Sequence, residues 1–271
     1  MFKRMFSRIS LSLIIAFFTV TMVFASALVF NKKLRPNTIV IDTENTLVLD
    51  QEVNTLSASR IVEGILTSTA PTINLYIKSP GGSVMDGTRL INVIHNTNKK
   101  INCIIDVAAS MAFAITQACD NRMIAENGVL MQHVASYGLE MQQQPNAESF
   151  VQFLSRLLEY NNKLQAERIG ITLEDFNKKV RNDWWLFGKE AVEQNAADEA
   201  VNVVCTEKML KSERINKVAT MFGAVDVVFN ACPLIDIPKS VPKPREMKEE
   251  DFLKFYDNLI VRNRVMSFYK R

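Results

Sequence analysis

The sequence is poor in the residues that build metal sites and disulfide scaffolds. Its 271 residues include only two histidines and four cysteines. The cysteines form no C-x-x-C pair, so a structural zinc site is not expected and no cofactor is indicated. The formal charge is only +3, and basic residues do not alternate with aromatic ones outside the termini. The composition therefore argues against nucleic acid as a partner.

Low-complexity runs are also lacking. Hydrophobic residues make up 48% of the chain and charged residues 23%. This balance is typical of a globular domain with appendages, and the chain is long enough to bury a substantial core.

One long hydrophobic run lies at the N-terminus. Residues 9–30 contain 22 consecutive uncharged residues, which would span about 33 Å as a helix, enough to cross a bilayer. Within them, Ala25-Ser26-Ala27 also fits a signal-peptidase cleavage site. We therefore expect residues 1–30 to be a signal peptide or a membrane anchor, with the length favouring the anchor. The protein would then be membrane-anchored or secreted across the cytoplasmic membrane, in the periplasm.

Buried strands and amphipathic helices alternate along the middle of the chain. This alternation predicts an α/β fold with a largely parallel sheet. Strands are expected within residues 38–48 and at 73–77, 101–107, 129–133 and 200–204, and helices at 53–66, 84–95, from 110, and at 147–168, 173–180 and 188–194.

The composition changes after Cys205. A basic helix, an apolar patch at residues 225–229, a proline-spaced linker at 233–244 and an amphipathic helix at 248–262 are expected there. We divide the chain into residues 1–30, a domain at 31–205 and a C-terminal helical extension at 206–271, an interaction or regulatory element. A Cys205–Cys232 disulfide would pin the extension to the domain; buried thiols are the alternative.

A serine, a histidine and an aspartate form the candidate catalytic set. Ser110 lies at a strand-to-helix junction, where the amide of Met111 and that of Gly82 could face the same oxygen. Serine needs a base, and His133 at a strand end is better placed than His95, which lies in a helix leading to a polar stretch. Asp183 could orient the histidine. Taken singly, each is more often a packing or capping residue.

In combination and order, these segments resemble the proteolytic subunit of the Clp protease, a serine peptidase of the Clp/crotonase fold. The resemblance spans about residues 38–204. The matching segments are Gln51-Glu52-Val53, Leu75-Tyr76-Ile77-Lys78-Ser79-Pro80-Gly81-Gly82-Ser83, Ala108-Ala109-Ser110-Met111, Val129-Leu130-Met131-Gln132-His133, and Asp183 with Glu190-Ala191.

The resemblance implies a repeated ββα spiral and a role for each matching residue. Ser110 would be the nucleophile, His133 the base and Asp183 the triad acid, with oxyanion donors at Gly82 and Met111. The substrate, a peptide or an unfolded protein, would lie as an extended strand beside the glycine turn and the residues after the histidine, in contact with Gly82, Ser83, Val84 and Ser136. The family assembles as rings, so a homo-oligomeric ring is implied.

Two departures from the family pattern change this expectation. Gln142-Gln143-Gln144 replaces the glycine-rich arm that follows the histidine, which puts ring stacking in doubt. Little sequence separates the apolar segment from the first strand, so the loops that meet an ATP-driven unfoldase are not expected. An exported enzyme would also meet no such ATPase partner. The resemblance therefore favours ATP-independent peptide cleavage.

Two other functions remain open. A relative of signal peptide peptidase A would use a serine-lysine dyad at the membrane, with Lys163 or Lys178 as the base. A non-catalytic scaffold would keep the fold and recruit partners through its C-terminal extension. Acyl-CoA chemistry of the crotonase branch is disfavoured because a triad would be superfluous there.

Overall fold

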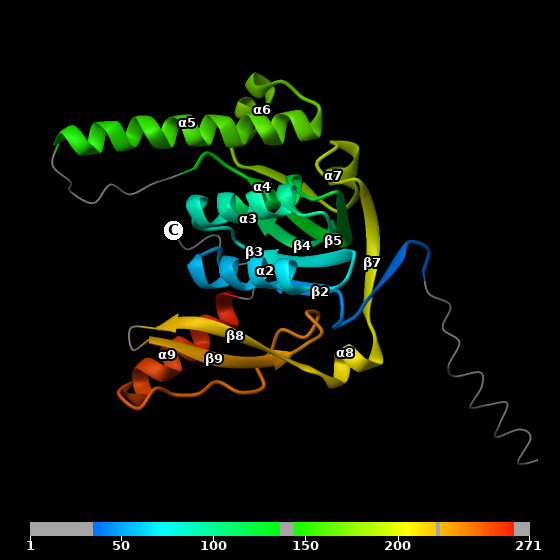
Figure 1. Ribbon diagram of the computed structural model, residues 1–271, viewed down its shortest axis with the longest axis vertical. Helices are drawn as coiled ribbons and strands as arrows, with labels where there is room; N and C mark the ends of the chain where they lie inside the picture. The colour runs from blue at the N-terminus through cyan, green and yellow to red at the C-terminus, as the bar shows by residue number, and fades with distance from the viewer. Residues whose placement is uncertain (1–34, 136–143, 221–222, 263–271) are drawn as a thin grey trace, which may run out of the picture. The chain divides into compact units, whose positions relative to one another are not determined.

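The computed structural model describes residues 35–135, 144–220 and 223–262 (Figure 1). The chain divides into two units, residues 1–36 and 37–271, and the described helices and strands belong to the second. The expected signal peptide or anchor at residues 1–30 lies outside the described residues. None of the helices in the described ranges has the length and apolar character needed to cross a membrane.

A seven-stranded sheet forms the centre of the second unit. Its order is β1-β7-β5-β4-β3-β2, and β6 pairs with β5 outside this path. Pairs along the path are parallel and the β5–β6 pair is antiparallel. The mostly parallel sheet confirms the predicted α/β class. The strands are β1 (Thr38–Ile41), β2 (Thr46–Leu49), β3 (Thr72–Ser79), β4 (Lys100–Ala109), β5 (Asn121–Gln132), β6 (Trp184–Phe187) and β7 (Glu199–Cys205).

Strand β5 pairs with two different strands along its edge opposite β4. Its first half pairs with β7 at residues 123–125, and its second half pairs with β6 at residues 129–132. Only the second half was predicted, and β6 was not predicted at all. The split matters for function because the second half of β5 leads directly to His133, and β6 directly follows Asp183.

Helices cover the sheet as the hydrophobic periodicity predicted. Figure 1 shows α2 and α3 in front of the sheet. The main core includes Leu49, Ile77, Leu90 and Phe113, all fully buried, and each such side chain contributes about 1.5–3 kcal/mol by leaving water. The helices are α2 (Thr55–Thr67), α3 (Val84–Asn96), α4 (Met111–Gln117), α5 (Gln144–Ile169), α6 (Leu173–Val180) and α7 (Lys189–Glu193).

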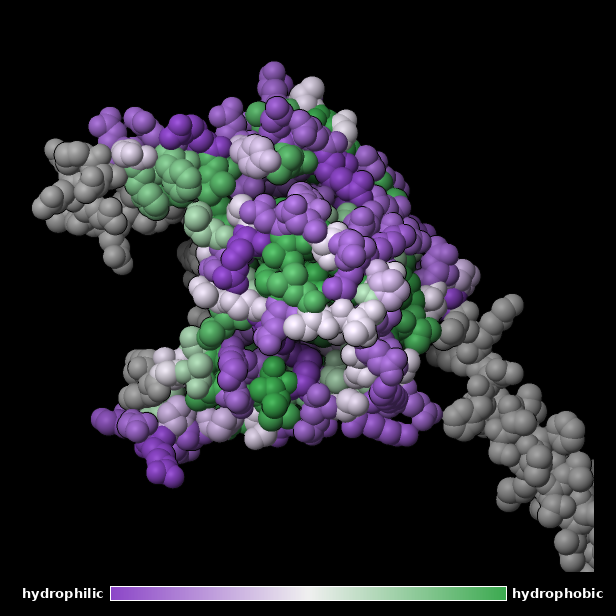
Figure 2. Space-filling model, in the orientation of Figure 1, coloured by the Kyte–Doolittle hydropathy of each residue, from purple (hydrophilic) through white to green (hydrophobic). Residues whose placement is uncertain are grey.

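Helix α5 is anchored at one end only. Its buried residues, Asn161, Gln165, Ala166 and Ile169, all lie in the C-terminal third. The other end extends beyond α3 in Figure 1, and hydrophobic side chains cover much of it in Figure 2. The attachment of α5 to the domain therefore depends on a short stretch of helix.

The C-terminal extension is less helical than expected. Helix α8 (Glu207–Lys211) is followed by an antiparallel hairpin of β8 (Glu213–Thr220) and β9 (Gly223–Asn230), and α9 (Glu249–Arg262) comes last. The predicted basic helix is wrong over residues 213–220, although the last predicted helix is present. The basic residues of this segment recur at helical spacing, at Lys208, Lys211, Arg214 and Lys217. Arg214 and Lys217 nevertheless lie in β8, because their backbone pairs with β9.

Covalent and ionic contacts tie the extension to the sheet domain. A disulfide joins Cys205 to Cys232, the pairing predicted from the sequence. Arg214 of β8 contacts the buried Asp50 carboxylate at 2.7 Å. Lys78, just before the glycine turn, forms an ion pair with Asp236. The extension is therefore bound close to β2 and β3.

A second, unpredicted disulfide joins Cys103 of β4 to Cys119, shortly after α4. No free cysteine occurs in the described part of the chain. All four cysteines of the sequence are thus paired.

Candidate active site

Ser110 occupies a sharp turn between β4 and α4. Its backbone has φ 54° and ψ −121°, a conformation that is uncommon for a residue with a side chain and often marks functional sites. The turn is fixed on both sides: the Ser110 amide donates to the Met131 carbonyl of β5 at 2.8 Å, and its carbonyl accepts from Ala114 at 3.2 Å. The side chain makes no helix-cap hydrogen bond, so its hydroxyl is available to another group.

That other group is His133. The structure places Nε2 of His133 2.9 Å from Oγ of Ser110. The histidine directly follows β5, the strand that also holds the Ser110 amide, so both residues are positioned by one pair of neighbouring strands. This distance lies within the range for proton transfer between a nucleophile and a base.

Asp183 lies close to the pair in the strand register but does not contact it. Gln132 pairs with Trp184 at the end of the β5–β6 ladder, so Asp183 and His133 occupy the next opposing positions. Asp183 is exposed, has φ 53°, and shares no hydrogen bond or ion pair with His133 in the described residues. Its role in the triad stays a prediction.

The glycine turn packs directly against the Ser110 turn. Gly81 and Gly82 have φ of 88° and 143°, which L side chains rarely adopt. A Cβ at Gly81 would come within 2.7 Å of the Met111 nitrogen and 2.5 Å of the Ala109 oxygen. Only glycine allows the two turns to approach this closely.

The same turn leaves one amide free. Val53 donates to the Gly81 carbonyl and accepts from the Ser83 amide, both at 2.8 Å. The Gly82 amide between them points away from this bridge, and neither it nor the Met111 amide has an acceptor in the described residues. These are the two donors predicted for an oxyanion hole.

The predicted substrate-binding residues have different outcomes. Ser83 caps α3 by accepting from the Asp86 amide at 3.2 Å, and Val84 begins that helix. Both adjoin the glycine turn, as expected. Ser136 lies outside the described residues.

The competing bases are occupied elsewhere. Lys163 pairs with Glu167 at 3.9 Å and Lys178 pairs with Glu174 at 2.8 Å, each on its own helix and more than half exposed. His95 is exposed on α3. Across the described ranges, no group of three or more potential ligands could hold a metal ion.

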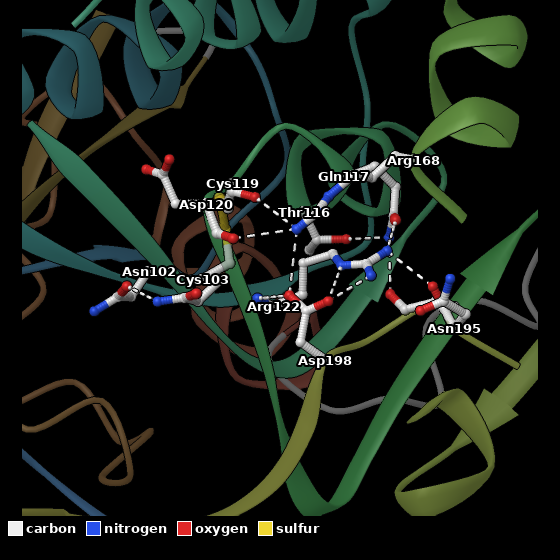
Figure 3. Close-up of polar contacts among 12 residues, drawn as sticks. Asn102, Cys103, Thr116, Gln117, Cys119, Asp120, Arg122, Arg168, Asn195 and Asp198 are labelled. Atoms are coloured by element: carbon white, nitrogen blue, oxygen red, sulfur yellow. Dashed lines mark hydrogen bonds and ion pairs between the residues drawn. A yellow bond between two sulfur atoms is a disulfide. The ribbon is translucent and has the colours of Figure 1, made fainter. Parts of the chain in front are cut away.

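A buried arginine supports the elements around this site, and the sequence reasoning missed it. Figure 3 shows Arg122 of β5 between α4 and the segment before β7. Its side chain is 1% exposed and binds Asp198 at 2.6 Å, Gln117 at 2.6 Å and the Asn195 carbonyl at 2.9 Å. The only signal in the sequence is an arginine beside a run of apolar residues.

Asp198 is the anionic partner in this network. Burial alone would raise the pKa of its carboxyl, but the hydrogen bonds and charge of Arg122, with the charge of Arg168, outweigh burial and hold the pKa below its usual value. The carboxylate is therefore ionised at neutral pH. It links α5, through Arg168 at 3.3 Å, to Arg122 of β5 at 2.6 Å.

The sheet domain is similar in sequence to known proteins. The family described as Clp protease matches residues 35–203, more than half of the chain. The "ATP-dependent Clp protease proteolytic subunit 2" of Prochlorococcus marinus (strain NATL2A) is 29% identical over 168 residues, covering 59% of this chain and 84% of the relative. The "ATP-dependent Clp protease proteolytic subunit 3" of Synechococcus sp. (strain CC9605) is 27% identical over 169 residues, covering 60% and 84%. The chain belongs to the Clp protease family.

Proposed function

We propose that this member of the Clp protease family is a serine endopeptidase that acts through Ser110 and His133. The observation that carries the proposal is the 2.9 Å contact between the serine hydroxyl and the imidazole. His133 would take the hydroxyl proton as Ser110 attacks the peptide carbonyl, and the amides of Gly82 and Met111 would stabilise the resulting oxyanion. The imidazolium would then protonate the leaving amine, and water would release the acyl group by the reverse sequence.

Asp183 completes the proposed triad. A movement of the residue just before β6 would bring its carboxylate to the second ring nitrogen of His133, where it would fix the tautomer and stabilise the imidazolium. The opposing positions of the two residues in the strand register support this role. Formation of the homo-oligomeric ring that the family resemblance implies would supply the movement.

A peptide substrate would lie extended along the glycine turn. Gly82, Ser83 and Val84 would line it. No ATPase partner is proposed, and the substrate would be a short peptide or an unfolded protein.

We also propose that the enzyme works outside the cytoplasm, held by residues 1–30 or released after their cleavage. The two disulfides support an oxidising compartment, and the uncharged run at residues 9–30 supports export. Mass spectrometry of the intact mature protein distinguishes an anchor from a cleaved signal, since cleavage after Ala27 gives a chain beginning at Leu28.

Labelling with a fluorophosphonate probe tests the proposed chemistry. We expect covalent labelling of Ser110 in the oligomeric full chain, loss of the label in Ser110→Ala, and a strong decrease in His133→Ala. His95→Ala is the matched control and should label normally. Retained labelling in His133→Ala with loss in Lys163→Ala or Lys178→Ala would favour the serine-lysine dyad. No label on folded oligomer would favour the non-catalytic scaffold.

A further inference from the structure

Two buried glutamines connect the candidate base to α5. Gln132, the last residue of β5, is 6% exposed, and Gln165 of α5 is 4% exposed. Nε2 of Gln132 donates to Oε1 of Gln165 at 2.6 Å. Oε1 of Gln132 accepts from the backbone amide of His133 at 3.0 Å. The Gln132 side chain therefore holds the histidine backbone at one end and α5 at the other.

The direction of this chain of hydrogen bonds is fixed further along. Nε2 of Gln165 donates to the Asn161 carbonyl at 3.0 Å, so Oε1 of Gln165 must face Gln132. Gln132 then has only its own oxygen to offer to the His133 amide. Because each amide has one donor end and one acceptor end, a change at Gln165 alters the partner that His133 finds.

Disturbing these hydrogen bonds is costly because both glutamine side chains are buried. A buried donor or acceptor without a partner costs about 1–3 kcal/mol. The imidazole of His133 is half-buried and must stay within hydrogen-bond reach of Ser110. A shift of about 1 Å in a catalytic group can lower a rate by about 100-fold.

We propose that Gln132 and Gln165 are positioning residues that set the His133 backbone, and through it the imidazole, relative to Ser110. The position of α5 is thereby coupled to the candidate base. The inference rests on the proposed function, because it assigns a purpose to the pair only if His133 acts on Ser110.

The test uses a compensated double variant of the full chain. Gln165→Leu alone leaves the buried Nε2 of Gln132 without an acceptor and should lower the free energy of unfolding. Gln132→Leu with Gln165→Leu removes both members of the side-chain pair, so no buried Nε2 is left without an acceptor. The double variant still leaves the His133 amide without its acceptor.

We expect stability and reactivity to separate in this pair of variants. The double variant should regain part of the stability lost in Gln165→Leu, yet its rate of fluorophosphonate inactivation should stay about 10–100-fold below wild type. With a peptide substrate, kcat should fall while KM stays within about twofold. Asn162→Leu, a change on α5 that removes an exposed hydrogen bond to Asn177 of α6, should match wild type in both measurements.

Two results would overturn the inference. One is a folded double variant that reacts as fast as wild type, and the other is a defect confined to KM. If wild type itself does not react, the proposed function has failed rather than the role of the glutamines. Should the double variant not fold, Gln132→Met, which keeps the side-chain length, carries the same expected loss of reactivity and the same refuting results.

Discussion

Replacing Arg122 by methionine tests how much the buried network stabilises the fold. The change keeps most of the side-chain volume but removes the hydrogen bonds to Asp198, Gln117 and the Asn195 carbonyl. Removing one partner of a buried ion pair costs about 3–5 kcal/mol. Asp198 is one-third exposed and keeps Arg168 at 3.3 Å, so its uncompensated charge adds little, and we expect the lower limit of about 3 kcal/mol.

Thermal and urea unfolding followed by far-UV circular dichroism measure this loss. About 3 kcal/mol corresponds to a decrease in Tm of about 6–12 °C for a domain of this size. Arg168→Met is the matched control, because its guanidinium binds the same carboxylate but is 36% exposed, and it should cost less than about 1 kcal/mol. Arg122→Lys, which keeps the charge but loses the fork of donors, should lie between them.

Two results would refute this expectation: a loss of less than about 1 kcal/mol of unfolding free energy in Arg122→Met, or an equal loss in Arg122→Met and Arg168→Met. The first result would mean that water or a local shift provides new hydrogen bonds for the groups that Arg122 had bound. The second would mean that charge near Asp198, rather than the buried hydrogen bonds of Arg122, supplies the stability.

Three further predictions concern pH, disulfides and the glycine turn. Because the pKa of Asp198 is lowered in the folded protein, its stabilisation is present above the unfolded-state pKa of about 3.9 and is lost as the pH falls through the lower folded value; urea unfolding should therefore show Asp198→Asn well below wild type at pH 7 and closer to it at about pH 3. Thiol titration of denatured, unreduced protein should find no free thiol, and Cys205→Ser with Cys232→Ser, which opens a crosslink across 27 residues, should cost about 3 kcal/mol; free thiols in the native chain would contradict the pairing. Gly81→Ala should abolish fluorophosphonate labelling because its Cβ would strike the Met111 nitrogen and the Ala109 oxygen, whereas Gly223→Ala, which also has positive φ but open space around it, should label normally.

Elements with strong periodicity were predictable from the sequence. The strand at β3, the amphipathic helices α2 and α3, and α6 all lie within one or two residues of their predicted bounds. In these segments the spacing of apolar residues alone specifies which face is buried.

Elements defined by pairing were not predictable. Strand β6 is only four residues long, and β5 begins with two polar residues, Asn121 and Arg122. The basic segment at 213–220 has helical charge spacing, yet it pairs with β9 along its whole length. In each case the partner strand is distant in sequence or lacks a local signal, so propensity gave way to tertiary contacts.

By itself, the sequence determined the residue types of the candidate site and their order. A serine at a strand-to-helix junction, a histidine at a strand end and paired glycines after a buried strand are local features, and each survives in the structure. The Cys205–Cys232 pairing was also predicted from the sequence. Only the tertiary structure decided that the imidazole touches the hydroxyl, that Asp183 stops short of it, and that Arg122 and two glutamines support the surrounding elements. Those outcomes depend on strand register and on buried polar groups finding distant partners, which no local pattern specifies.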